Sequence, residues 1–128
     1  MNAELLDQPP PAALDSEIAL LAGFAEAKRI NPDIYIRADQ FCDHRNAAIF
    51  QAMLDLEGEH GTWDDPSLVD RLRRHPRWDK DGFDFGYSAE VFGTPGLPSM
   101  AAYHAGKIIE AWRRRSIGNA ALDIFQAS

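Results

Sequence analysis

The residues that come closest to a chemical motif form an acidic turn, Asp79-Lys80-Asp81-Gly82, with Glu90 at the twelfth position counted from Asp79. A calcium-binding helix–loop–helix takes ligands from positions 1, 3, 5 and 12 of its loop and needs glycine at position 6. Here position 5 is Phe83 and position 6 is Asp84, so two of these features are missing. We interpret the segment as an ordinary acidic turn and predict no metal site.

Thiol and imidazole groups are scattered along the chain: Cys42, His44, His60, His75 and His104. Their spacing matches no zinc signature. Cys42 and His44 are two residues apart at a predicted helix start, where side chains do not face each other, so they make a poor nucleophile and base. We expect Cys42 to be a small buried residue and His44 to belong to the helix start.

Phosphate chemistry is also unsupported. The chain lacks Gly-x-x-x-x-Gly-Lys-Ser/Thr, the loop that cradles nucleotide phosphates, so we expect no ATP and no magnesium in it. Arg113-Arg114-Arg115 could touch phosphate, but three consecutive helical residues fan around the axis and make no flat basic face. Two roles stay open for them: a solvated or ion-paired face, and contact with a partner. We predict no catalytic residues and no enzyme activity in this chain.

Composition fits one soluble domain. The chain has 128 residues, 45% hydrophobic and 26% charged, with a net charge of -7. An acidic surface repels nucleic acid, so weak or no direct DNA binding is expected. No apolar run reaches the roughly 18 residues of a membrane span, and no secretory signal is present. We expect a cytoplasmic protein, and the single cysteine suits a reducing compartment.

The charge is unevenly spread. Residues 99–128 hold four basic and two acidic side chains, a net charge of +2, which leaves -9 for residues 1–98. An acidic head and a mildly basic helix can attract each other, or a second copy.

The elements that must position these residues are helices. Residues 1–13, with three consecutive prolines, are expected to be a flexible tail, and residues 14–98 a globular helical head. Asp15 or Ser16 can cap a first helix, whose core face would be Ile18, Leu21, Ala22 and Ala25. At Asn31-Pro32 we predict a short helix, although Ile34 to Ile36 could form a strand.

Three more helices complete the predicted head. One follows Asp43 and ends at Gly58 or Gly61. Another begins at Asp65-Pro66 and is broken by His75-Pro76. A short one lies near Ser88 to Phe92. The fold class is therefore all-α: a compact orthogonal bundle of about five or six helices that ends in one long helix.

The long helix spans residues 99–128, with Ser99 as its predicted cap. It stays amphipathic to its end, so we expect the first half of a helical hairpin that has been truncated. Its apolar arc is wider than a small head can cover, and part of it should meet another helix. For Trp112 core packing and partner contact remain open. The predicted interaction residues are Ile108, Ile109, Trp112, Ile117, Ala121, Ile124 and Phe125.

An ordered string of residues resembles a known family. It comprises Pro9-Pro10-Pro11, Asp15-x-Glu17, Asp39-Gln40-Phe41, His44-Arg45, Ile49-Phe50, Met53-Leu54, Gly61, Asp65-x-x-Leu68-Val69-x-x-Leu72, and Tyr103, Ile108 and Arg114 or Arg115 on the long helix. This order and spacing resemble the N-terminal domain of DnaB-type bacterial replicative helicases.

The resemblance implies a non-catalytic module of a hexameric, ATP-driven helicase whose motor lies in a separate domain. It implies self-association, as a dimer or within a ring, and recruitment of the C-terminal domain of primase in DNA replication. Because only one hairpin helix is present, we expect a monomer or a loose dimer. Two alternatives stay open: a free-standing helical adaptor that mimics a helicase loader or inhibitor, and a small DNA-binding regulator.

Overall fold

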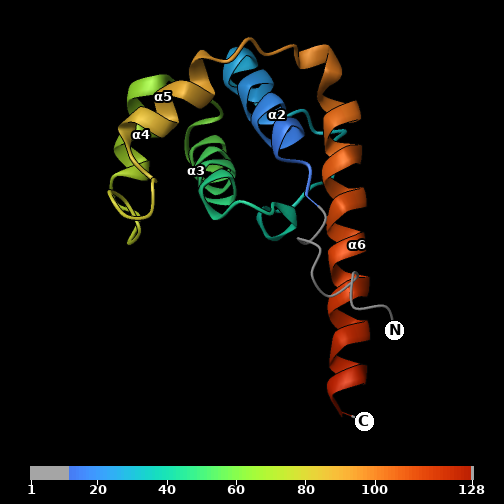
Figure 1. Ribbon diagram of the computed structural model, residues 1–128. Helices are drawn as coiled ribbons and strands as arrows, with labels where there is room; N and C mark the ends of the chain where they lie inside the picture. The colour runs from blue at the N-terminus through green and yellow to red at the C-terminus, as the bar shows by residue number, and fades with distance from the viewer. Residues whose placement is uncertain (1–11, 128) are drawn as a thin grey trace.

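The computed structural model describes residues 12–127, in which helices and two short 3-10 turns surround one core. Residues 1–11 of the predicted flexible tail lie outside this range. The order is α2 (Leu14–Ala27), η1 (Ala38–Gln40), α3 (His44–His60), α4 (Asp65–Leu72), α5 (Phe85–Gly93), η2 (Pro98–Met100) and α6 (Ala101–Ala127). The predicted all-α bundle that ends in one long helix is confirmed (Figure 1).

Helix α2 runs through the middle of the fold. Its N-cap is Ala13, with no side-chain cap, so the prediction that Asp15 or Ser16 caps it was wrong. Asp15 lies in the first turn, where its negative charge interacts favourably with the positive end of the helix dipole. Leu20, Leu21 and Phe24 are buried, and the helix ends at Lys28 in the left-handed conformation, with φ of 55°.

The segment after Asn31 is not the short helix that we predicted. The Asn31 side-chain oxygen accepts a hydrogen bond from the Asp33 N–H at 2.9 Å, and the Asn31 backbone carbonyl accepts one from the Ile34 N–H at 3.0 Å. These bonds close a turn instead of capping a helix, because asparagine offers the backbone an alternative to helical pairing. An extended stretch then leads to η1, whose Gln40 side chain accepts from the Arg37 N–H.

Helices α3, α4 and α5 each begin at an aspartate. Asp43 caps α3, Asp64 caps α4 and Asp84 caps α5, each accepting a backbone N–H from the first turn of its helix. The α4 cap is therefore one residue earlier than predicted, and α5 is longer than the predicted Ser88–Phe92. α3 ends at Gly61, whose φ of 77° needs glycine.

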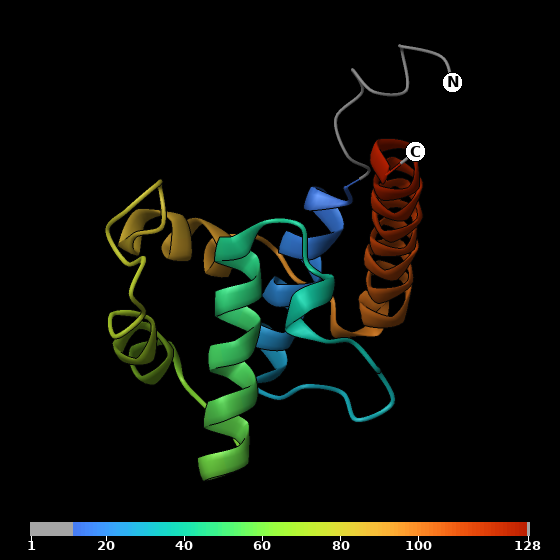
Figure 2. The same cartoon turned by 90° about the horizontal axis from the view of Figure 1, so that it is seen from below.

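Helix α6 lies along one side of the head (Figures 1 and 2), and its C-terminal half extends past the head (Figure 1). It begins at Ala101, so Ser99 lies in η2 and is not its cap. The connection to α6 crosses α2 very closely. A Cβ atom on Gly96 would lie 2.3 Å from the carbonyl carbon of Ala22, so only glycine fits there without movement of the backbone.

Candidate interaction surface

The first half of α6 is held by the head. Ala101, Ala105, Ile108 and Ala111 are buried, and Ile109 is partly buried against the same core. Ile108 is only 1% exposed, so the prediction that it contacts a partner was wrong. Its face of the helix packs along α2, where the apolar side chains of both helices exclude water.

The middle of α6 is braced by the loop before α3. The Arg37 guanidinium carbon lies 5.2 Å from the centre of the Trp112 ring, a cation–π contact. Arg115 donates a hydrogen bond to the Gln40 carbonyl oxygen at 2.9 Å. Trp112 is partly buried, so it contributes to the fold of its own chain and keeps some exposed surface.

Beyond Arg115 most of the described apolar residues of α6 are exposed. Ile117 is 69% exposed, Ile124 73% and Phe125 57%, and Ala121 is exposed between them. We call these four residues the distal stripe. Alternating steps of four and three residues connect Glu110, Arg114, Ile117, Ala121 and Ile124, which therefore share one face of α6. This is the spacing that coiled-coil helices use for the face that contacts a second helix.

The arginine run has different surroundings at each residue. Arg114 forms an i,i+4 ion pair with Glu110 at 2.7 Å, Arg115 contacts the head, and Arg113 is exposed. This agrees with an ion-paired face rather than a flat basic surface.

A buried polar cluster, which the sequence analysis missed, joins α2 to the start of α3. The Glu17 side chain is fully buried and accepts hydrogen bonds from the Cys42 N–H at 2.7 Å, the Asp43 N–H at 3.3 Å and the Asn46 amide at 3.0 Å. Asn46 also accepts a hydrogen bond from the Tyr87 hydroxyl. The available signal was the place of Glu17 one helical turn before the predicted core residue Leu21, since a carboxylate buried there needs such partners.

The charged groups beside this cluster are not tuned for catalysis. Burial raises the pKa of the Asp43 carboxyl, but hydrogen bonds from Arg45 outweigh that effect and the pKa is lowered overall. Burial, with the negative charge of Asp43, raises the pKa of Tyr87 to about 12. Asp43 is thus ionised and Tyr87 protonated near neutral pH, and neither is poised to exchange protons.

The acidic turn wraps an aromatic anchor. Phe83 is fully buried and contacts the rings of His44, His75 and Trp78, while Asp79 and Asp81 adopt positive φ angles around it. Within residues 12–127, no three His, Cys, Asp or Glu side chains gather closely enough to hold a metal ion. The prediction that Cys42 is buried was wrong, because the residue is exposed. Only its backbone N–H reaches the buried cluster, where it donates a hydrogen bond to the Glu17 carboxylate.

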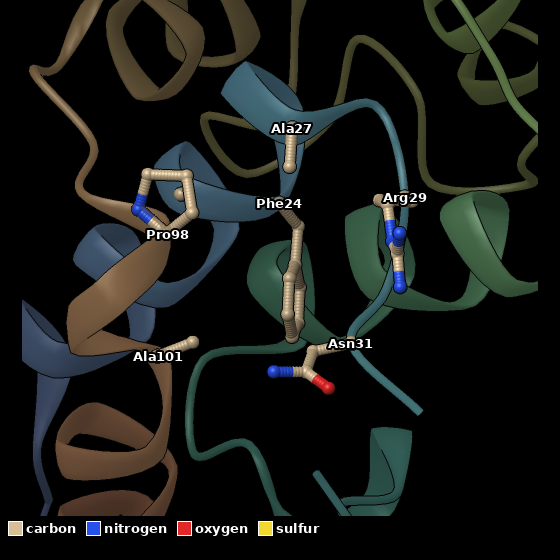
Figure 3. A pocket seen from close by; sticks show the side chains of 7 residues that line it. Phe24, Ala27, Arg29, Asn31, Pro98 and Ala101 are labelled. Atoms are coloured by element: carbon tan, nitrogen blue, oxygen red, sulfur yellow. The ribbon is translucent and has the colours of Figure 1, made fainter. Parts of the chain in front are cut away.

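A recess of about 280 Å³ lies where the end of α2 meets the start of α6 (Figure 3). Its lining residues are Gly23, Phe24, Ala27, Arg29, Asn31, Pro98 and Ala101. The lining holds no carboxylate, thiol or imidazole, so it lacks the groups for acid–base or nucleophilic chemistry.

Comparison with known proteins agrees with this arrangement. The family model for the DnaB-like helicase N-terminal domain matches residues 9–110. The fold is similar to the crystal structure of the N-terminal domain of DnaB helicase from Mycobacterium tuberculosis, with a TM-score of 0.79 and 23% sequence identity over 92% of this chain and 83% of that one. No curated protein matched the chain. Within the described residues, no helix has both the length and the apolar character needed to cross a membrane.

Proposed function

We propose that this chain, which belongs to the family of DnaB-like helicase N-terminal domains, is a non-catalytic assembly domain that pairs with a second helix through the distal stripe of α6. ATP hydrolysis would reside in a separate motor domain, and the protein would act in DNA replication in the cytoplasm. The exposed apolar residues at the end of α6 are the observation that carries this proposal.

The pattern of exposure supports a helical partner. Isolated surface apolar residues need no explanation, but four on one face of one helix form a contiguous patch of the kind that marks an interface. Their alternating spacing favours packing against another helix at a shallow angle. Glu110 and Arg114 continue the same face, and they form an ion pair with each other at 2.7 Å, so the apolar part of this face begins at Ile117.

We expect the partner helix to come from a second copy, giving a loose dimer that could contribute to a ring in a longer protein. Four side chains, one of them alanine, make a modest interface, which is the reason to expect weak pairing. Recruitment of the C-terminal domain of primase belongs to the same proposal and rests on the family resemblance. The net charge of -7 argues against direct DNA binding.

Self-association can be tested by sedimentation equilibrium. The double variant Ile117→Asp, Ile124→Asp should remain a monomer at concentrations where the wild-type mass rises towards that of a dimer, because the new charges would be desolvated in the interface. Leu97→Asp is the matched control, since Leu97 is 66% exposed but lies outside α6. A wild-type chain that stays monomeric at about millimolar concentration would refute the proposed pairing.

Primase recruitment needs a separate experiment. Titration of the chain with the host's primase C-terminal domain should give saturable binding, and Trp112→Ala should weaken it if the exposed part of that ring is used. The Ile117→Asp, Ile124→Asp variant then distinguishes contact with the chain itself from contact that requires pairing. No binding to the wild-type chain would remove primase from the proposal and leave self-association standing.

A further inference from the structure

The described chain begins beside the face of α6 that carries the distal stripe. Ahead of α2 it approaches the middle of α6 (Figure 1). Ala12 and Ala13 line a hollow of about 420 Å³ together with four residues of α6, which are Lys107, Glu110, Ala111 and Arg114. Glu110 and Arg114 belong to the face that continues into Ile117 and Ala121. Residues 1–11 therefore join the described structure next to the distal stripe.

The length of this N-terminal segment, residues 1–11, is sufficient to cover the stripe. Extended residues advance by about 3.3 Å each, so Leu5 and Leu6 can reach up to about 20 Å from Ala12. Helix α6 rises by about 1.5 Å per residue, which places Ala121 only about 10 Å beyond Arg114 along its axis. Three consecutive prolines follow the leucines and favour an extended backbone. The two leucines can therefore meet the stripe without any movement of the head.

The composition of the N-terminal segment complements the surface of α6. The run Glu4-Leu5-Leu6-Asp7 places two apolar side chains between two carboxylates, and residues 1–11 hold no basic side chain. Residues 107–127 of α6 hold four basic and two acidic side chains. The leucines can exclude water from the exposed isoleucine of the stripe, and a mildly basic helix attracts the carboxylates beside them.

Covalent attachment favours this segment over a second copy in dilute solution. A segment joined by a short linker acts at an effective concentration on the order of millimolar. A second copy of α6 reaches such a concentration only in concentrated protein, and its modest interface gives it no large advantage. The stripe of an unpaired chain is therefore most readily covered by residues of the same chain.

We propose that Leu5 and Leu6 pack on Ile117 and Ala121 of their own chain and so compete with the pairing of α6. This regulation rests on the proposed pairing through the distal stripe, which it opposes. Two chains pair only when the N-terminal segment has left the stripe. The apparent affinity of pairing is then reduced in proportion to the fraction of chains whose stripe is open.

A spin label on residue 3 tests the contact within one chain. The ¹⁵N-labelled full chain carries Ala3→Cys for the nitroxide and Cys42→Ser, because Cys42 is exposed and would also react. Amide signals of residues 117–121 should be broadened at a protein concentration where sedimentation shows a monomer. Leu5→Asp, Leu6→Asp in the same labelled chain should restore these signals. Because the label stays attached in this control, the length of the tether alone cannot explain the difference.

Sedimentation equilibrium of unlabelled protein measures the competition. Leu5→Asp, Leu6→Asp should self-associate about tenfold more tightly than the wild type, which corresponds to a stripe that is covered in about nine-tenths of the chains. Asn2→Asp, Gln8→Asp is the matched control, since it adds the same charge to the segment and keeps both leucines. This control should not strengthen self-association.

Broadening within the labelled chain, together with the gain in self-association, would support the proposal. Three results would overturn it: no broadening at residues 117–121, broadening that persists in Leu5→Asp, Leu6→Asp, or unchanged self-association of that variant. Broadening of unlabelled ¹⁵N chains by added spin-labelled chains would place the segment on a second copy and would also overturn it. If wild type and variant both stay monomeric, pairing is refuted and the competition with it, and persisting broadening distinguishes this result from loss of the contact.

Discussion

The two halves of α6 both carry apolar residues, but on opposite faces of the helix, and have different surroundings. Between Ala101 and Ala111 the apolar face is buried against α2, and at Trp112 and Arg115 the loop before α3 braces the helix. From Ile117 onward the apolar side chains lie on the face that carries Glu110, about half a turn from the buried face, and Ile117 and Ile124 are 69% and 73% exposed. The first half of α6 therefore directs its apolar residues towards the head, and the distal half directs its apolar residues away from it.

This contrast shows that amphipathicity reports only that a face is suited to be covered. Whether the face is covered by the same chain or by another one depends on which side of the helix the head lies and on how far along the helix it reaches. Two contacts hold α6 against the head. Gly96 lets the connection before α6 pass close to α2, and Arg37 contacts Trp112 in the middle of α6. Together they determine how far along α6 the contact with the head reaches.

The largest expected effect is a difference in stability between a variant in the first half of α6 and a variant in the distal half. Ile108→Ala removes a side chain that is 1% exposed and should lower the free energy of unfolding by about 3 kcal/mol, through lost burial and a cavity. Ile124→Ala, at 73% exposure, should cost less than about 0.5 kcal/mol in the monomer. Urea denaturation at low protein concentration measures both. Equal losses would mean that the distal half is also packed within its own chain.

The close crossing of α2 gives a second test. Gly96→Ala should cost about 1–3 kcal/mol, because the new methyl group meets backbone atoms of Ala22 and Gly23, which cannot move aside as a side chain would. Gly118→Ala on the distal half has open space around the added atom and should not destabilise the monomer. Thermal unfolding of the two variants compares them directly. A neutral Gly96→Ala would show that the connection is not what fixes the start of α6.

The boundary between the halves has a smaller expected effect. Arg37 and Trp112 should show a coupling energy of about 0.5–1 kcal/mol in a double-mutant cycle of Arg37→Ala and Trp112→Leu, as for partly exposed cation–π pairs. Chemical denaturation of the four proteins gives the value. If the two losses are simply additive, the loop does not brace α6 through this contact.

Much of the fold could be predicted from the sequence, because α3, α4 and α6 combine clear apolar periodicity with strong end signals such as Asp43, Gly61 and Pro66. The segment after Asn31 was mispredicted for a definite reason. Asn-Pro is compatible with both a helix start and a turn, and the outcome depended on side-chain hydrogen bonds within the loop.

The candidate site was less predictable. Ile108 and Ile124 are 16 positions apart and therefore lie on nearly opposite faces of α6. Both faces are apolar in part, and the sequence alone does not distinguish the face that the head covers from the face that it leaves exposed. The burial of Glu17 depends on three donors that lie 25 to 29 residues away in the chain, a long-range arrangement that local patterns do not encode.

The smallest expected effect is a loss of stability at acid pH. It tests whether protonation of His75, which packs on Phe83, also affects α6. Burial, with the positive charge of Arg77, lowers the pKa of His75 below its ordinary value of 6.5. As the pH falls from 6.5 through that lowered pKa, the unfolded chain takes up a proton that the folded chain resists, so the free energy of unfolding should decrease. Urea denaturation at pH 7.5 and 5.5 should show a small decrease in the free energy of unfolding at the lower pH, and His75→Asn should reduce that decrease because asparagine takes up no proton. Asparagine can still accept a hydrogen bond from the Arg77 N–H, so the variant keeps this contact of the fold. The amide shifts of α6 should not change with this protonation, because His75 packs on Phe83 and not on α6. A shift of α6 that His75→Asn abolishes would instead mean that the two sides of the head are coupled.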